Sequence, residues 1–191
     1  MNKMKKTSSP TIIFLHLFIL IILIPPIQST LSHTSLLEQI CRQSPHYHLC
    51  TITLRSSINH RSKEDIVGFA RLALRIVNAN ATITIDHIKK GYVQTTSLME
   101  KEALKDCLAL YNMIVNVHLL EALNALNKRD YKIVKQRAYV AGIQAETCDY
   151  KFKNSSRKPL KDTNRYVQNL CAIIMSIVNK LILTNQPTSS Y

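Results

Sequence analysis

The segment ALKDCLALYNMIVNVHLLEALNALNKRDYKI, from Ala103 to Ile133, decides the fold. Its apolar residues recur every three or four positions, as one face of a continuous α-helix requires. They are Leu104, Leu108, Tyr111, Val115, Leu119, Leu123 and Leu126. The polar residues 127–130 then interrupt this stripe, and Asp130 is a suitable N-cap for a second helix. The segment therefore predicts a long helix, a tight turn and a returning helix.

The rest of the chain shows the same helical pattern. Glycine occurs only three times, so helix breakers are rare. A heptad seam near the C-terminus consists of Val167, Leu170, Ile174, Ile177 and Leu181. We predict helices at residues 33–42, 45–57, 63–90, 97–128, 131–152 and 159–184. Pro45 opens the second of these, and Gly91 ends the third. Thr82–Ile85 is β-branched and locally disfavours helix. The predicted fold class is all-α: an up-and-down four-helix bundle with an N-terminal helical hairpin.

The N-terminus has the layout of a secretory signal peptide. MNKMKK is basic, and it precedes an apolar run at residues 12–24 that ends at Pro25-Pro26. The run is shorter than the ~20 residues of a membrane span, so an uncleaved signal anchor is the less favoured alternative. We predict a signal peptide at residues 1–30, cleaved between residues 28 and 33. Residues 31–191 then form one secreted domain without a membrane anchor.

Secretion makes disulfides the expected state of the cysteines. Two bridges among five cysteines allow 15 pairings. Cys41 and Cys50 flank Ser-Pro, and a bridge between them would close the hairpin. Cys107 and Cys148 fall at similar heights on the antiparallel helices 97–128 and 131–152, so a bridge there is natural. Cys171 is then a buried free thiol. His46 and His48 lie between the first two cysteines, but no zinc-type spacing accompanies them, and we predict neither a metal nor a cofactor.

The charge and the motifs argue against several functions. The formal net charge is +13, but tryptophan is absent and the basic residues are scattered, so no nucleic-acid partner is expected. No nucleophile elbow, phosphate loop or metal-binding His-Glu motif is present, so we predict that the protein is not an enzyme. Glu100, Glu102 and Asp106 are interpreted as the polar face of a helix start. Asn80 and Asn154 open N-glycosylation sequons, as in a secreted glycoprotein.

Taken together, the motifs resemble the plant invertase and pectin methylesterase inhibitor family. They are LLEQICRQSPHYHLC, DIVGFARLAL, the segment quoted above, AETCDYKF and KPLKDTNRYVQNLCAIIMSIV. The resemblance spans residues 36–183 and implies a four-helix bundle with a helical hairpin. It also implies the disulfides Cys41–Cys50 and Cys107–Cys148. Many members have Ser-Ala-Ala where this chain has Ala138-Tyr139-Val140-Ala141, so packing or the binding face differs there.

The resemblance implies a secreted inhibitor that binds a plant carbohydrate-active enzyme in a one-to-one complex. Acid invertase is the favoured target, pectin methylesterase is the alternative, and a non-inhibitory bundle of the same fold is a second alternative. Invertase inhibitors of this family carry Pro-Lys-Phe after the turn acid, and Lys132 is the residue that matches. The target-binding candidates are Lys128, Arg129, Asp130, Tyr131, Lys132 and Ile133. The expected location is the apoplast or cell wall, with the vacuole as the alternative.

Overall fold

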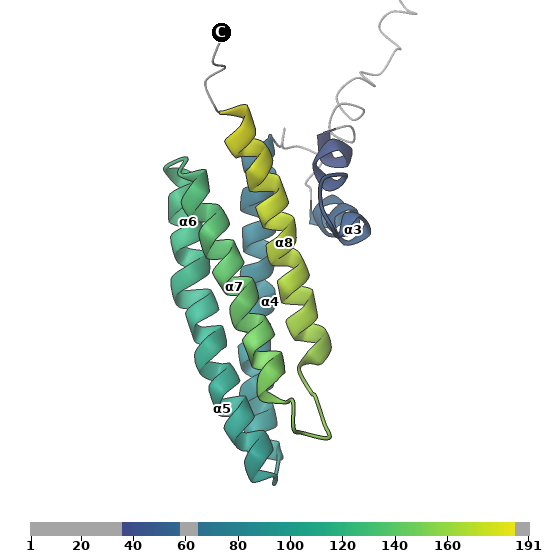
Figure 1. Ribbon diagram of the computed structural model, residues 1–191, viewed down its shortest axis with the longest axis vertical. Coiled ribbons are helices and arrows are strands. Elements are labelled where there is room, and N and C mark those ends of the chain that lie inside the picture. Colours follow the sequence, from purple (N-terminus) through teal and green to yellow (C-terminus); the bar gives the residue numbers. More distant parts are fainter. Residues whose placement is uncertain (1–35, 58–64, 186–191) are drawn as a thin grey trace, which may run out of the picture. The chain divides into compact units, whose positions relative to one another are not determined.

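The computed structural model describes residues 36–57 and 65–185, which form helices without a strand among them. The predicted signal peptide and its cleavage site lie outside these residues. A short helix occupies residues 36–41. The labelled elements are α3 (Tyr47–Ser57), α4 (Ile66–Gln94), α5 (Leu98–Met113), η1 (Ile114–Leu119), α6 (Leu120–Asn127), α7 (Tyr131–Lys151) and α8 (Lys161–Thr184) (Figure 1).

In the described residues, α4, the continuous segment from α5 to α6, α7 and α8 make the predicted up-and-down four-helix bundle, whose arrangement Figure 1 shows. The segments α5, η1 and α6 follow one another without a break, so they act as one helix in the bundle. This composite helix packs against α4 and α7, and α8 packs against both α4 and α7. Each helix therefore has two neighbours, and short connections join consecutive helices. The all-α bundle expected from the periodicity is confirmed.

The core consists of one apolar face from each helix. In α8, all five residues of the predicted heptad seam are buried: Val167, Leu170, Ile174, Ile177 and Leu181. The buried face of α4 includes Phe69, Leu74 and Ile88. By length and composition alone, α4 and α8 are apolar enough to cross a membrane. In this domain their apolar faces are packed into the core instead.

One polar pair crosses the centre of the bundle. The hydroxyl of Tyr111 on α5 donates a hydrogen bond to Oδ1 of Asn164 on α8 at 2.8 Å, and both side chains are fully buried. Burial raises the pKa of Tyr111 well above its ordinary value, so the phenol remains a donor. This bond links the second and fourth helices of the bundle.

The end of α4 differs from the prediction. The helix continues through Gly91 to Gln94, and the carbonyl of Gly91 accepts a bond from Thr95 N at 3.0 Å. The β-branched stretch at residues 82–85 is also helical. There, Thr84 Oγ1 donates to the carbonyl of Asn80 at 2.7 Å, and Thr84 and Ile85 are buried. Packing therefore outweighs the weak local preferences that suggested an earlier end.

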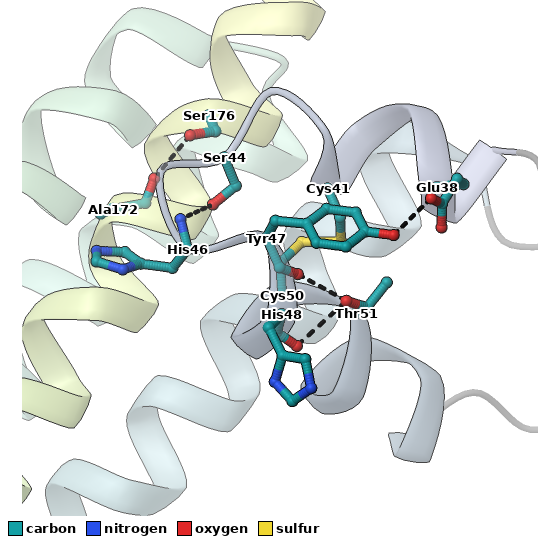
Figure 2. Close-up of a disulfide and its surroundings, with 10 residues drawn as sticks. All are labelled: Glu38, Cys41, Ser44, His46, Tyr47, His48, Cys50, Thr51, Ala172 and Ser176. Atoms are coloured by element: carbon teal, nitrogen blue, oxygen red, sulfur yellow. Dashed lines mark hydrogen bonds between the residues drawn. A yellow bond between two sulfur atoms is a disulfide. The ribbon is translucent and has the colours of Figure 1, made fainter.

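The N-terminal hairpin carries the disulfide Cys41–Cys50, whose Cα atoms are 5.5 Å apart (Figure 2). Helix α3 begins at Tyr47, so the predicted start at Pro45 is wrong by two residues. Ser44 Oγ accepts from His46 N at 3.2 Å, and the carbonyl of His46 accepts the first helical bond, from Cys50 N. Pro45 therefore lies in the turn before the helix.

The second disulfide, Cys107–Cys148, joins α5 to α7 across the core, with Cα atoms 4.9 Å apart. Both bridges have the pairing expected from the sequence. Cys171 on α8 is a free, buried cysteine. Burial raises the pKa of its thiol to about 12, so the thiolate that would react is scarce. The structure gives Cys171 a packing role.

Candidate functional site

The predicted target-binding residues form the connection between α6 and α7. It is a Schellman turn: Asp130 N donates to the carbonyl of Ala125 at 2.9 Å, and Arg129 N donates to that of Leu126 at 3.1 Å. Asp130 then caps α7, because its Oδ1 accepts from Ile133 N at 3.2 Å. Carbonyls at the end of α6 and an amide at the start of α7 are thus satisfied within residues 125–133. The turn is short and fixed by its own hydrogen bonds.

Arg129 occupies the left-handed position of this turn, with φ of 59°. Glycine usually takes this position because a Cβ atom makes the conformation unfavourable. Arg129 is the one non-glycine residue with positive φ within residues 36–57 and 65–185. A strained arginine where glycine would be more stable suggests that its side chain serves a purpose outside the fold. Lys128, Arg129 and Asp130 are all exposed.

Two interactions hold the turn against the rest of the bundle. Arg71 Nη1 on α4 donates to Oδ1 of Asn127, the last residue of α6, at 2.6 Å. Arg137 on α7 pairs with Glu121 on α6, with 2.5 Å between Nε and Oε2. The first contact joins α4 to the end of α6, and the second joins α6 to α7. They fix the position of the turn relative to α4 and α7.

The three residues after Asp130 have different roles. Tyr131 is only 9% exposed and belongs to the core. Ile133 is half-buried and packs against the core. Lys132 between them is exposed in the first turn of α7. Of the Tyr131-Lys132-Ile133 triplet, Lys132 is therefore the side chain that is free to contact a partner.

Lys132 lines the edge of a groove of about 470 Å³ between α7 and α8. The other lining residues are Lys135, Gln136, Tyr139, Met175 and Ile182. Lysines therefore border a mainly apolar surface, and none of the described residues that line it is acidic. Tyr139 is 55% exposed. The site therefore combines a cation with an accessible aromatic ring.

Exposed apolar side chains also occur further along α7. Ile143 lies four residues after Tyr139 and Tyr150 lies seven further on, which places them on one side of the helix. Both side chains are exposed. The exposed Glu146 lies between them on the same side. The outward side of α7 therefore carries apolar side chains among polar ones, and no apolar stripe in the sequence predicts it.

Two buried polar residues were not anticipated. His118 lies in the π-helical segment η1 and is 5% exposed. Glu100 was expected on the polar face of a helix start, but it is 7% exposed. The prediction for Glu100 is wrong because the local pattern does not account for residues distant in sequence: Arg157, Pro159 and Leu160 line the same pocket as Glu100. The other two acids of this group fit the predicted polar helix face. Glu102 is exposed, and Asp106 Oδ2 forms an ion pair with Lys151 Nζ at 2.8 Å.

The histidines and sequon asparagines singled out in the sequence do not form a common site in the described residues. In Figure 2, the rings of His46 and His48 point in different directions. Within the described ranges, no three histidine, cysteine, aspartate or glutamate residues come together in a way that would hold a metal. The sequon residue Asn154 lies exposed in the connection before α8. Asn80 is half-buried in the middle of α4, where its Nδ2 donates to the carbonyl of Ile76 at 2.8 Å.

Known proteins share this fold and sequence pattern. Residues 35–177 match the family model described as "Plant invertase/pectin methylesterase inhibitor". "Cell wall / vacuolar inhibitor of fructosidase 1" from Arabidopsis thaliana is 29% identical over 146 residues, which cover 76% of this chain and 69% of the relative.

Two crystal structures of Arabidopsis pectin methylesterase inhibitors have the same fold. Mutant form A of one inhibitor gives a TM-score of 0.68 at 21% identity and covers 75% of this chain and 95% of its own. Another, from Arabidopsis thaliana, gives 0.58 at 22% identity, with coverages of 77% and 96%. The likeness to these structures supports the bundle itself. The family model covers most of the chain, and the chain therefore belongs to the plant invertase/pectin methylesterase inhibitor family, a family of enzyme inhibitors rather than of enzymes.

Proposed function

We propose that this protein inhibits an acid invertase, in a one-to-one complex made through the α6–α7 turn. The observation that carries the proposal is the exposure of Lys132 at the edge of an apolar groove. The catalytic centre of a glycosidase holds a pair of carboxyl groups. A lysine that enters such a centre forms an ion pair that desolvation strengthens.

The groove also supplies an aromatic contact. Family members that inhibit invertase have a phenylalanine directly after the lysine, whereas Ile133 is half-buried here. Tyr139 lies two helical turns beyond Lys132 and lines the same groove. Tyrosine is frequent among the residues that dominate binding energies, because its ring buries a large area and loses little entropy. We infer that Tyr139 provides the aromatic anchor.

The similarity to the Arabidopsis relative supports invertase over pectin methylesterase. That relative is named an inhibitor of fructosidase, and invertase is a β-fructosidase. Its name also places it in the cell wall or vacuole. We propose the same two compartments for this protein, with the cell wall favoured. The predicted signal peptide supports entry into the secretory pathway.

A direct test titrates the purified protein against an acid invertase and a pectin methylesterase at mildly acidic pH. Inhibition of invertase at a stoichiometry of one supports the proposal. Inhibition confined to the methylesterase would assign the protein to the other activity of the family. Inhibition of neither enzyme would indicate a non-inhibitory bundle.

The contribution of Lys132 is tested by Lys132→Glu. We expect the inhibition constant for invertase to rise at least tenfold, because the new carboxylate faces the carboxylates of the target. A glutamate in the first turn of α7 suits the helix dipole, so folding should be unaffected. Lys161→Glu is the matched control, since Lys161 is also an exposed lysine in the first turn of a helix. Equal effects of both substitutions would remove Lys132 from the interface.

A further inference from the structure

A second pocket lies at the end of the bundle opposite the α6–α7 turn. The last turns of α4, the first turns of α5 and the connection before α8 form its walls, and these segments meet at one end of the bundle in Figure 1. Its volume is about 430 Å³, which is within the usual range for small-molecule sites. Its titratable lining residues are His87, Lys90, Glu100 and Arg157. None of these residues has a role in the proposed inhibition.

Glu100 is a fixed acceptor in the wall of this pocket. Its Oε2 accepts from Thr95 Oγ1 at 3.0 Å, and its backbone N donates to Ser97 Oγ at 3.3 Å. Within the described part of the chain, Oε1 has no hydrogen-bond partner and no cation lies within ion-pair distance of the carboxylate. A largely buried carboxylate without a cation is costly to maintain. The free oxygen is suited to accept hydrogen bonds from hydroxyl groups.

Three basic residues line the same pocket without pairing to Glu100. None of His87, Lys90 and Arg157 forms an ion pair within residues 36–57 and 65–185. Lys90 comes from α4, whereas Arg157 comes from the connection, where its backbone N donates to Ser155 Oγ at 3.3 Å. A guanidinium group binds a carboxylate in a fork geometry, and an ammonium group adds charge. The pocket therefore offers donors to an anion and an acceptor to hydroxyl groups.

We propose that this pocket binds a sugar acid, that is, a carboxylate that also carries several hydroxyl groups. The carboxylate pairs with Arg157 and Lys90, and a hydroxyl group donates to Glu100. A neutral sugar leaves the cations unpaired, a simple inorganic anion leaves Glu100 without a donor, and a basic ligand is repelled by Lys90 and Arg157. The sugar acid has two possible sources: a free monosaccharide, or one unit of an acidic polysaccharide.

Calorimetric titration of the purified protein tests this site. D-galacturonate is compared with D-galactose, which lacks only the carboxylate, and with a galacturonate trimer. We expect saturable binding of galacturonate at least tenfold tighter than that of galactose. Tighter binding of the trimer than of galacturonate would identify the polysaccharide as the source. Equal affinities of the two would identify the free acid as the source. The absence of saturable binding to both acids, or equal binding of galactose, would overturn the proposal.

Substitutions locate the binding in this pocket. Arg157→Gln should weaken galacturonate binding at least tenfold, and Glu100→Gln should weaken it severalfold while the bond to Thr95 is retained. Lys158→Gln is the matched control, because this exposed neighbour removes the same charge outside the pocket lining. Equal losses in Arg157→Gln and Lys158→Gln would indicate diffuse electrostatics and overturn the site. Invertase inhibition should not change in any of these variants.

Discussion

His118 places an imidazole in the bundle core without a hydrogen bond to either ring nitrogen among the described residues. Burial is the main cause that lowers its pKa, and the positive charge of Arg137 lowers it further. The carboxylate of Glu121 acts in the opposite direction and raises it. Glu121 pairs with Arg137, so the one carboxylate that favours a protonated His118 is already paired with a cation. The neutral ring is therefore the stable form in the folded protein.

This arrangement predicts a loss of stability in acid. The folded-state pKa of His118 lies below its ordinary value of 6.5, so the unfolded chain takes up the proton more readily. The stability contributed by the neutral ring is present above pH 6.5 and is lost as the pH falls towards the folded-state pKa. His118→Leu should reduce this loss, as measured by urea unfolding at neutral and at mildly acidic pH. His48→Gln, at an exposed position, should leave the pH dependence of the wild type unchanged. Parallel curves for His118→Leu and the wild type would contradict the prediction.

At the level of single residues, the exposure of Lys132 in the candidate site was easier to predict from the sequence than the burial of its neighbours. Lys132 was identified from the turn and the motif, and both are local features. Whether Tyr131 or Ile133 contacts a partner depends on how α7 packs, and packing buries Tyr131 in the core. Tyr139 was noted as a departure from the family pattern, but its place in the groove depends on Met175 and Ile182 of α8. Contacts between helices distant in sequence cannot be obtained from periodicity.

At the level of elements, the apolar periodicity predicted where the helices lie. Single residues such as Pro45 and Gly91 predicted the helix ends less accurately. The seam of α8 is buried as predicted because a single spacing fits it throughout. Gly91 was expected to end α4, but its backbone is helical, and a Cβ atom placed there would contact the side chain of Leu104 at 3.5 Å. The π-helical segment η1 has no local sequence signal. It adds a residue to the turn, so that His118 and Leu119 are buried next to each other.

The connection between α6 and α7 yields a prediction about strain. Arg129→Gly should stabilise the protein by about 0.5–1 kcal/mol, because glycine adopts the left-handed conformation without a Cβ penalty. The midpoint of thermal unfolding should rise by roughly 1–4 °C for a chain of this size. The same substitution should weaken invertase inhibition if the arginine contacts the target.

Lys128→Gly is the matched control for this prediction. It removes the same charge one residue earlier, where φ is −85° and glycine relieves no strain. That variant should lose about 0.5–1 kcal/mol through the greater flexibility of its unfolded chain. A loss of stability in both variants would show that Arg129 is not strained in solution.

At the level of the whole molecule, the two disulfides stabilise different ranges of the chain. The bridge Cys41–Cys50 spans nine residues within the hairpin, whereas Cys107–Cys148 spans 41 residues and joins two helices of the bundle. A cross-link restricts the unfolded chain more strongly when it closes a longer loop. Because both pairs have fully buried sulfur-bearing residues, each double alanine variant also leaves a similar small gap in the core.

Replacing both cysteines of a pair by alanine separates these contributions. Loss of Cys107–Cys148 should cost about 4 kcal/mol and loss of Cys41–Cys50 about 3 kcal/mol, as measured by urea unfolding. Alkylation checks the bonding state: the folded wild type should react at no cysteine, and the unreduced, unfolded wild type at Cys171 alone, since burial raises the pKa of this thiol to about 12 in the folded protein. If removal of the hairpin bridge costs as much as removal of the bundle bridge, loop closure is not the main source of the stabilisation. The strength of the hairpin bridge would then come from its packing in the folded state, where both of its cysteines belong to the same hydrophobic cluster as the bundle helices.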